Sequence, residues 1–164
     1  MRDADFERLY EREAQSLFGF LVYRTGDRHL AEDLLADAFE RALRSKARFD
    51  RRRGSERTWL YTIALNLLRD HARRAAAEGR ALDRAGAGGT EGVAEAGGGA
   101  YAAVEQRDVV RRAMERLSEE EREAIALRFG ADLSVPEMAR VLGEPLTTVE
   151  GRVYRALRKL RDRM

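Results

Sequence analysis

The sequence predicts an all-α protein of two small helical domains joined by a flexible linker. Apolar residues recur at helical spacing in both halves, and no segment shows the sustained apolar and polar alternation of a strand. Between the halves, residues 75–105 include Ala-Gly-Ala-Gly-Gly at 85–89 and three glycines at 97–99. This composition is typical of a linker, and no preceding strand supports a phosphate-binding glycine loop. The predicted domains are therefore residues 1–74 and 106–164.

Composition limits the classes of function. The 164 residues include 37% charged residues but carry a net charge of only +2, so local charge clusters are more informative than the total. Cysteine is absent, which excludes disulfides and thiolate metal sites, and His29 and His71 have no second ligand at metal-binding spacing. No apolar run is long enough to insert into a membrane. We expect a cytoplasmic, non-enzymatic protein without metal or cofactor.

The first domain is predicted to contain three helices. Asp27 follows Gly26 and is the expected cap of the second helix, and the third helix is expected after Gly54 and Ser55. The three apolar stripes comprise Phe6, Leu9, Tyr10, Leu17, Phe18, Leu21 and Val22; Leu30, Leu34, Leu35, Ala38, Phe39 and Ala42; and Trp59, Leu60, Ile63, Ala64, Leu67 and Leu68.

The second domain is predicted to hold a helix-turn-helix. Three Ser/Thr-x-x-Glu helix starts begin at Ser118, Ser134 and Thr147. A short helix over 135–142 is expected to end at Gly143, and a tight turn leads into a final arginine-rich helix. This arrangement is typical of a module that places its second helix in the major groove of duplex DNA.

The final helix combines a basic face with an apolar face. From residue 152 to 163, six basic residues stand against one acidic residue, a local charge of +5. Arg152, Arg155 and Lys159 share one face by their spacing and are expected to point outward. The residues expected to pack inward are Val153, Ala156, Leu157 and Leu160.

A second basic cluster lies between the predicted second and third helices. Eight basic and two acidic residues from Arg41 to Arg57 give a local charge of +6. The cluster is either a solvated loop or a phosphate-binding surface. The neighbouring aromatic residues Phe49, Trp59 and Tyr61 favour single-stranded nucleic acid, whose unstacked bases need flat partners. Trp59 taken alone also fits a core position.

Two segments together resemble a known family. AEDLLADAFERAL at 31–43 and TWLYTIALNLLRDHARR at 58–74 resemble region 2 of bacterial sigma factors. LSEEEREAIALRFGADLSVPEMARVLGEPLTTVEGRVYRALRKLR at 117–161 resembles their region 4. A chain with these two regions and a linker is similar to the extracytoplasmic function group of the sigma-70 family.

The resemblance implies a docking site for RNA polymerase in the first domain. The helix containing AED is the element that docks on the clamp coiled coil of the β′ subunit. The residues implied in this contact are Asp33, Leu34, Asp37 and Phe39. The chain departs from the family at Ala36 and Ala38, where glutamine and threonine are usual.

The resemblance also implies that the third helix melts and reads the -10 element. Asn66 occupies the position that contacts a flipped base, although an asparagine can also mark the end of a helix. The residues implied at the -10 element are Arg57, Trp59, Tyr61, Asn66, Arg69, Arg73 and Arg74.

The final helix is implied to read the -35 element. Glu150 and Gly151 replace a common basic residue and serine. Glu150 either closes a capping box with Thr147 or accepts a hydrogen bond from cytosine N4. The residues implied in this contact are Thr148, Glu150, Gly151, Arg152, Tyr154, Arg155 and Lys159.

The resemblance therefore implies an alternative sigma factor that directs promoter-specific transcription initiation. The implied partners are promoter DNA, the β′ clamp and β flap of core RNA polymerase, and an anti-sigma factor. Two alternatives stay open. One is a free-standing dimeric DNA-binding regulator, and the other is a sigma-like decoy that binds a partner without initiating transcription.

Overall fold

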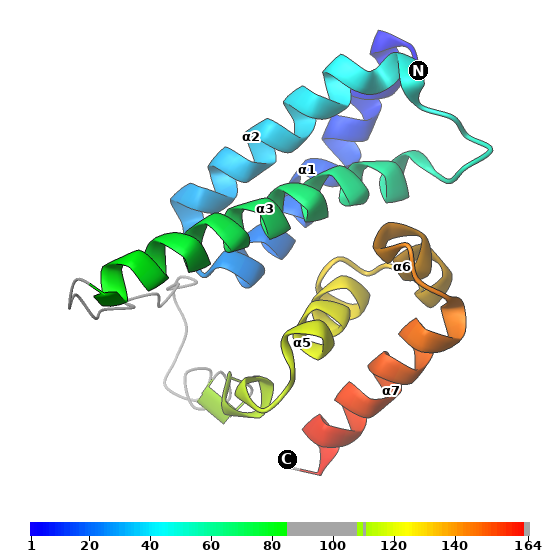
Figure 1. Ribbon diagram of the computed structural model, residues 1–164. Coiled ribbons are helices and arrows are strands. Elements are labelled where there is room, and N and C mark those ends of the chain that lie inside the picture. Colours follow the sequence, from blue (N-terminus) through cyan, green and yellow to red (C-terminus); the bar gives the residue numbers. More distant parts are fainter. Residues whose placement is uncertain (85–107, 110, 163–164) are drawn as a thin grey trace, which may run out of the picture. The chain divides into compact units, whose positions relative to one another are not determined.

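The computed structural model describes residues 1–84, 108–109 and 111–162 (Figure 1). These residues contain helices and no strand, which confirms the predicted all-α class. The chain divides into one unit spanning Met1–Ala94 and a second spanning Glu95–Met164.

The first unit is built from three long helices. They are α1 (Asp3–Thr25), α2 (Arg28–Ser45) and α3 (Glu56–Arg84), with a short 3-10 turn at Lys46–Arg48 after α2. Gly26 ends α1 with a φ of 67°, and the Asp27 side chain accepts hydrogen bonds from the backbone N–H groups of His29 and Leu30. The predicted cap at Asp27 is therefore confirmed.

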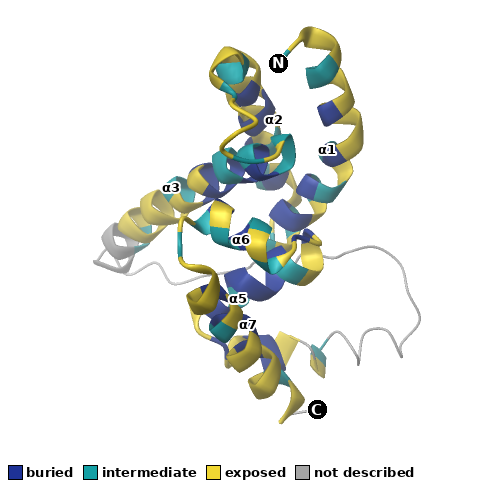
Figure 2. Cartoon of the chain, turned by 90° about the vertical axis from the view of Figure 1, so that its right-hand side faces the viewer, coloured by how far each residue is buried: buried dark blue, intermediate teal, exposed yellow. Residues whose placement is uncertain are grey.

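The three helices enclose one apolar core, seen as the dark blue faces in Figure 2. Both α1 and α2 pack on α3 and on each other. The largest fully buried side chains come from α1 and α3. Leu9, Leu17, Leu21 and Leu60 belong to the stripes predicted from the sequence, whereas Phe20, Tyr61 and Leu65 are buried but lie outside the predicted stripes.

Helix α3 is longer than the sequence predicts. It starts where the Ser55 hydroxyl accepts a hydrogen bond from the backbone N–H of Thr58 at 3.1 Å, and it continues to Arg84. Residues 75–84, predicted as linker, are helical because alanine, leucine, glutamate and arginine there favour helix propagation. The remaining linker residues 85–105 lie outside the described residues. Since α3 continues well beyond Asn66, the alternative that Asn66 marks a helix end is wrong.

The second unit contains the predicted helix-turn-helix. Helical residues at 108–109 and 111–115 precede α5 (Glu119–Ile125), a π-helical turn (Ala126–Gly130), α6 (Val135–Leu142) and α7 (Leu146–Arg161). Gly143 ends α6 with a φ of 66°, as predicted. Reciprocal hydrogen bonds join Ser118 to Glu121 and Ser134 to Glu137, so the first two predicted capping boxes are confirmed.

The third predicted capping box is wrong. Helix α7 begins at Leu146 because the extended backbone of Pro145 turns its carbonyl toward the helix. That carbonyl accepts hydrogen bonds from the backbone N–H groups of Thr148 at 3.1 Å and Val149 at 3.2 Å. Thr147 and Glu150 therefore lie inside α7, and the Glu150 side chain is exposed.

The core of the second unit lies between α5, α6 and α7. Val149, Val153 and Ala156 of α7 are buried, and Leu160 packs on the cluster formed by Met114, Leu117, Ile125 and Ala156. Leu157 is 41% exposed, so its predicted inward position is wrong. The buried residues of α7 recur every three or four positions, and Leu157 lies beside this stripe instead of within it. None of the described helices is both long and apolar enough to cross a membrane.

Candidate nucleic-acid interface

One face of α3 carries most of the residues assigned to single-stranded DNA. Asn66 follows Trp59 by seven positions and Arg73 follows Asn66 by seven, a spacing that keeps all three on one side of a helix. Asn66, Arg69 and Arg73 are exposed, and Trp59 is partly buried. The α3 face, defined here as Trp59, Asn66, Arg69 and Arg73, thus places an aromatic ring, an amide and two guanidinium groups along one line.

Trp59 is held by the loop that precedes α3. Its ring lies 5.2 Å from the Phe49 ring, centroid to centroid, with the two planes inclined by 55°. The contact fixes one side of the indole, and the remaining exposed surface is available to a partner. The two interpretations of Trp59, as a packing residue and as a stacking residue, are therefore compatible.

Tyr61 is a core residue, contrary to its prediction as a DNA contact. It is fully buried, its hydroxyl oxygen lies 3.2 Å from that of Ser16, and its ring makes an edge contact with Phe20. Burial raises the pKa of the Tyr61 phenol above its ordinary value. Two positions along a helix rotate a side chain by about 200°, so Tyr61 must oppose Trp59 on α3.

Arg57 joins α3 to α1 through a glutamate that sequence reasoning missed. Glu13 is only 5% exposed, and its Oε2 lies 3.4 Å from Nε of Arg57. The Arg57 guanidinium also lies over the Tyr61 ring, 5.7 Å from its centroid. A signal for this anchor exists in the sequence, because Glu13 lies midway between Leu9 and Leu17 on the buried stripe of α1.

The basic cluster between α2 and α3 is partly neutralised within the first unit. Arg51 pairs with Glu56 at 3.4 Å, Arg44 pairs with Glu40 at 2.5 Å, and Lys46 pairs with Asp3. Four further arginines of this cluster are exposed, namely Arg41, Arg48, Arg52 and Arg53. The cluster therefore still presents positive charge next to the α3 face, as electrostatic attraction of phosphates requires.

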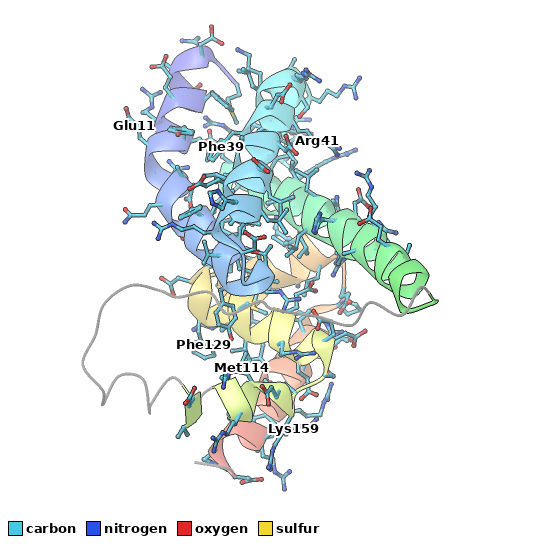
Figure 3. The ribbon with its side chains drawn as sticks, turned by 90° about the vertical axis from the view of Figure 1, so that its left-hand side faces the viewer. Glu11, Phe39, Arg41, Met114, Phe129 and Lys159 are labelled. Atoms are coloured by element: carbon cyan, nitrogen blue, oxygen red, sulfur yellow. The ribbon has the colours of Figure 1, made fainter. Side chains whose placement is uncertain are left out.

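Helix α2 separates the residues assigned to polymerase docking into two groups. Asp33 and Asp37 are exposed, four positions apart on one face. Leu34 and Phe39 are each 6% exposed and belong to the core, so their prediction as surface contacts is wrong. The Phe39 ring packs 4.8 Å from Tyr10 of α1, and Figure 3 shows it between α1 and α2 with Arg41 on the other side of α2.

The exposed face of α7 differs from the predicted one at one basic residue. Tyr154 is 65% exposed, and Thr148, Glu150 and Arg155 are also exposed. Arg152 is 9% exposed, so its prediction as an outward residue is wrong.

The cause is a set of carboxylates beside α7. Nη2 of Arg152 lies 2.7 Å from Oε2 of Glu144 and 3.8 Å from Oε2 of Glu120. Nζ of Lys159 donates a hydrogen bond of 2.7 Å to Oε1 of Glu121. Both basic residues therefore brace α7 within its own unit.

The contact with Lys159 affects the pKa of the Glu121 carboxyl. Its burial raises the carboxyl pKa, but the hydrogen bonds from Lys159 and from Ser118 and the charge of Lys159 outweigh burial and hold the pKa below its ordinary value. Among the described residues, no group of three or more His, Asp or Glu side chains is arranged to hold a metal ion.

Known proteins match both units in the order described. The family Sigma-70 region 2 matches residues 9–78, and the family Sigma-70, region 4 matches residues 107–160. The chain belongs to the sigma-70 family. The resemblance inferred from the two sequence segments is thereby confirmed.

The relatives are extracytoplasmic function sigma factors. The chain is 32% identical over 160 residues to BldN of Streptomyces coelicolor, with 94% of the chain covered. It is 25% identical over 159 residues to SigK of Mycobacterium tuberculosis, covering 97% of this chain and 85% of SigK. The chain spans only 58% of the length of BldN.

Solved structures of the group share the fold. The sigma factor RpoE of Bartonella quintana, solved with the anti-sigma factor NepR, superposes with a TM-score of 0.74 at 25% identity, covering 97% of this chain and 96% of that one. CnrH, solved with the cytosolic domain of CnrY, gives a TM-score of 0.69 at 25% identity, covering 98% and 88%.

The two family matches identify the units. The first unit is the region 2 domain and the second is the region 4 domain, so the α3 face lies in region 2 and the exposed face of α7 in region 4. The match to region 2 extends to residue 78, past the predicted domain end at 74.

Proposed function

We propose that this chain is an alternative sigma factor that binds core RNA polymerase and directs initiation at specific promoters. The observation that carries the proposal is the presence of both sigma-70 regions, each with an exposed basic helix face suited to nucleic acid. The chain would act by binding alone, as a dissociable subunit in the cytoplasm, where the polymerase and its template are found.

The α3 face would capture unpaired bases of the -10 element. Trp59 offers a flat ring for stacking, and the Asn66 amide can both donate to and accept from the edge of a flipped base. Arg69 and Arg73 would hold phosphates, with Arg74 at the border of the face, which fixes the position of the strand without reading its sequence. Flipping costs a few kcal/mol and is least costly where the base step is already weak.

The exposed face of α7 would enter the major groove at the -35 element. Thr148, Gly151, Tyr154 and Arg155 form the centre of that face, and Glu150 lies at its edge. With the capping role of Glu150 excluded by the start of α7, its carboxylate is available to accept a hydrogen bond from cytosine N4. Arg152 and Lys159 would hold α7 in place within region 4 by their ion pairs with acidic residues.

The exposed carboxylates of α2 would dock on the polymerase. Asp33 and Asp37 face solvent together and can meet basic residues of the β′ clamp, while region 4 would reach the β flap. Of the two departures from the family, Ala36 lies on this exposed face and Ala38 is fully buried. The structure of RpoE in complex with the anti-sigma factor NepR supports a further partner, an anti-sigma factor that would cover these surfaces.

The test is transcription of fragmented genomic DNA by purified core polymerase, with and without the full chain, followed by mapping of RNA 5′ ends. New start sites that share two upstream motifs at a constant spacing support the proposal. A variant with Trp59→Ala and Asn66→Ala serves as the matched control and should lose those starts. No new starts with an active core and a folded chain would favour a decoy or a free-standing regulator.

A further inference from the structure

Gly151 lies at the centre of the exposed face of α7, where its backbone does not need a glycine. Glycine lowers the stability of a helix interior relative to alanine because it costs more backbone entropy. It is usually retained where the chain adopts a positive φ or where another group must approach closely. Among the described glycines, positive φ values occur at Gly26, Gly54 and Gly143, and Gly151 is not one of them. A close approach is therefore the remaining physical reason.

The group that approaches is the guanidinium of Arg155. A Cβ added at residue 151 would lie 3.1 Å from Nη1 and 3.9 Å from Cζ of Arg155. The first distance is shorter than an ordinary van der Waals contact, so the Cβ of an alanine at 151 requires the guanidinium to shift by a few tenths of an ångström, and a larger side chain requires a larger shift. The Arg155 side chain thus lies back along α7 by one turn, toward the start of the helix, which is the direction that helix geometry favours.

This position matters because the first turns of a recognition helix contact base edges. Arg155 would otherwise act from the middle of α7, but its folded-back guanidinium lies at residue 151, one turn nearer the start of the helix. One helical turn advances by about 5.4 Å, which exceeds the spacing of neighbouring base pairs, about 3.4 Å. The placement of the guanidinium therefore decides which base pair it can meet.

The other basic residues nearby are less suited to this role. Arg152 is buried and pairs with Glu144, and Lys159, although half exposed, donates to Glu121, so both charges already have carboxylate partners within the region 4 unit. Arg155 is exposed and lies along the centre of the face. A planar guanidinium on that line can form the bidentate contact with N7 and O6 of guanine that is common in major-groove recognition.

We propose that Gly151 is a positioning residue, which sets the base pair read by Arg155 by leaving room for its guanidinium. The inference rests on the proposed function of α7 in reading the -35 element. It predicts that wild-type protein prefers guanine at one position of that element by about 5- to 150-fold, the range for one bidentate contact.

The test uses core polymerase, the full chain and a promoter found by the genomic transcription experiment. The -35 element of that promoter is randomised, and each template carries a transcribed barcode that identifies its sequence. Gly151→Ala and Gly151→Val increase the volume at 151 in steps. We expect the guanine preference to fall about threefold with alanine, because hydrogen bonds weaken steeply off geometry, and to disappear or move by one base pair with valine. Preferences at the other positions should persist.

Two controls separate positioning from a structural effect. Gly19→Ala changes an exposed glycine in α1 that has nothing within 4 Å of an added Cβ, and it should leave the profile unchanged. Arg155→Ala should abolish the same guanine preference. In the Arg155→Ala background, Gly151→Ala should then change nothing further, because residue 151 acts through Arg155.

Other outcomes contradict the inference. If Gly151→Val keeps the guanine preference, or lowers selectivity equally at all positions, residue 151 does not position Arg155. If Gly151→Ala has the same effect with and without Arg155, the missing side chain at 151 leaves room for the DNA and not for the guanidinium of Arg155. Wild-type protein that gives no promoter-dependent transcripts would refute the proposed function itself, a result that differs from all of these.

Discussion

Replacing Arg152 with alanine should destabilise the region 4 unit. Oε2 of Glu144 is buried and makes no hydrogen bond with the described residues, so the Arg152 guanidinium 2.7 Å away compensates its charge. A buried polar group left without compensation costs about 1–3 kcal/mol. The buried stem of Arg152 contributes about 1 kcal/mol more by packing. Because the Glu144 side chain is 33% exposed, water offsets part of the loss, and we expect about 2 kcal/mol in total.

The assay is thermal unfolding of the full chain followed by circular dichroism, with the region 4 transition analysed by itself. For a domain of this size, about 2 kcal/mol lowers the midpoint by about 8–16 °C. Arg158→Ala is the matched control, because Arg158 is exposed on the same helix and surface substitutions change stability by less than about 0.5 kcal/mol. If Arg152→Ala leaves the midpoint unchanged but weakens promoter binding, Arg152 is a DNA contact and its assignment as an internal brace is wrong.

Three further substitutions test other parts of the structure. Tyr61→Phe should lower the free energy of unfolding by about 1 kcal/mol, because the contact between the Tyr61 and Ser16 hydroxyls is lost. It should also reduce alkaline unfolding. The raised pKa of the folded Tyr61 phenol gives stability below about pH 10 that is lost as the pH rises further. Equal stability in calorimetry would contradict this. Glu121→Gln should make stability depend less on pH in the acid range. The lowered pKa of the folded Glu121 carboxyl gives stability above about pH 4.3 that is lost as the pH falls. An unchanged acid midpoint would show that Lys159 does not hold this carboxylate. Asn66→Ala should reduce transcription from duplex promoters at least about tenfold while leaving the unfolding midpoint within about 2 °C; a shifted midpoint would make Asn66 structural.

Local signals predicted most of the fold. Helix starts at Asp27, Ser118 and Ser134 and the end at Gly143 depend on hydrogen bonds within four residues, so the sequence contains their causes. The start of α7 was missed because a Thr-x-x-Glu pattern lies just inside a helix that Pro145 already begins. The extension of α3 was missed because glycines nearby suggested a linker.

The candidate site was less predictable, because a family motif assigns residues without saying which way they face. Leu34, Phe39 and Tyr61 lie within motif segments but point into the core. Their positions around the helix, counted from Trp59 or Asp33, would have distinguished these buried residues from the exposed ones. Arg152 pairs most closely with Glu144, and its second partner, Glu120, is distant in sequence, so neither contact could be read from α7 alone.

The central claim is that separate surfaces of the two units act on separate promoter elements, and strand opening tests it most directly. Permanganate reactivity of thymines in the -10 element should appear with core polymerase and the wild-type chain. It should be absent with Trp59→Ala and Asn66→Ala together, yet transcription by this variant should return on a template melted beforehand at that element. Equal permanganate reactivity with the variant would contradict the assignment of the α3 face to strand capture.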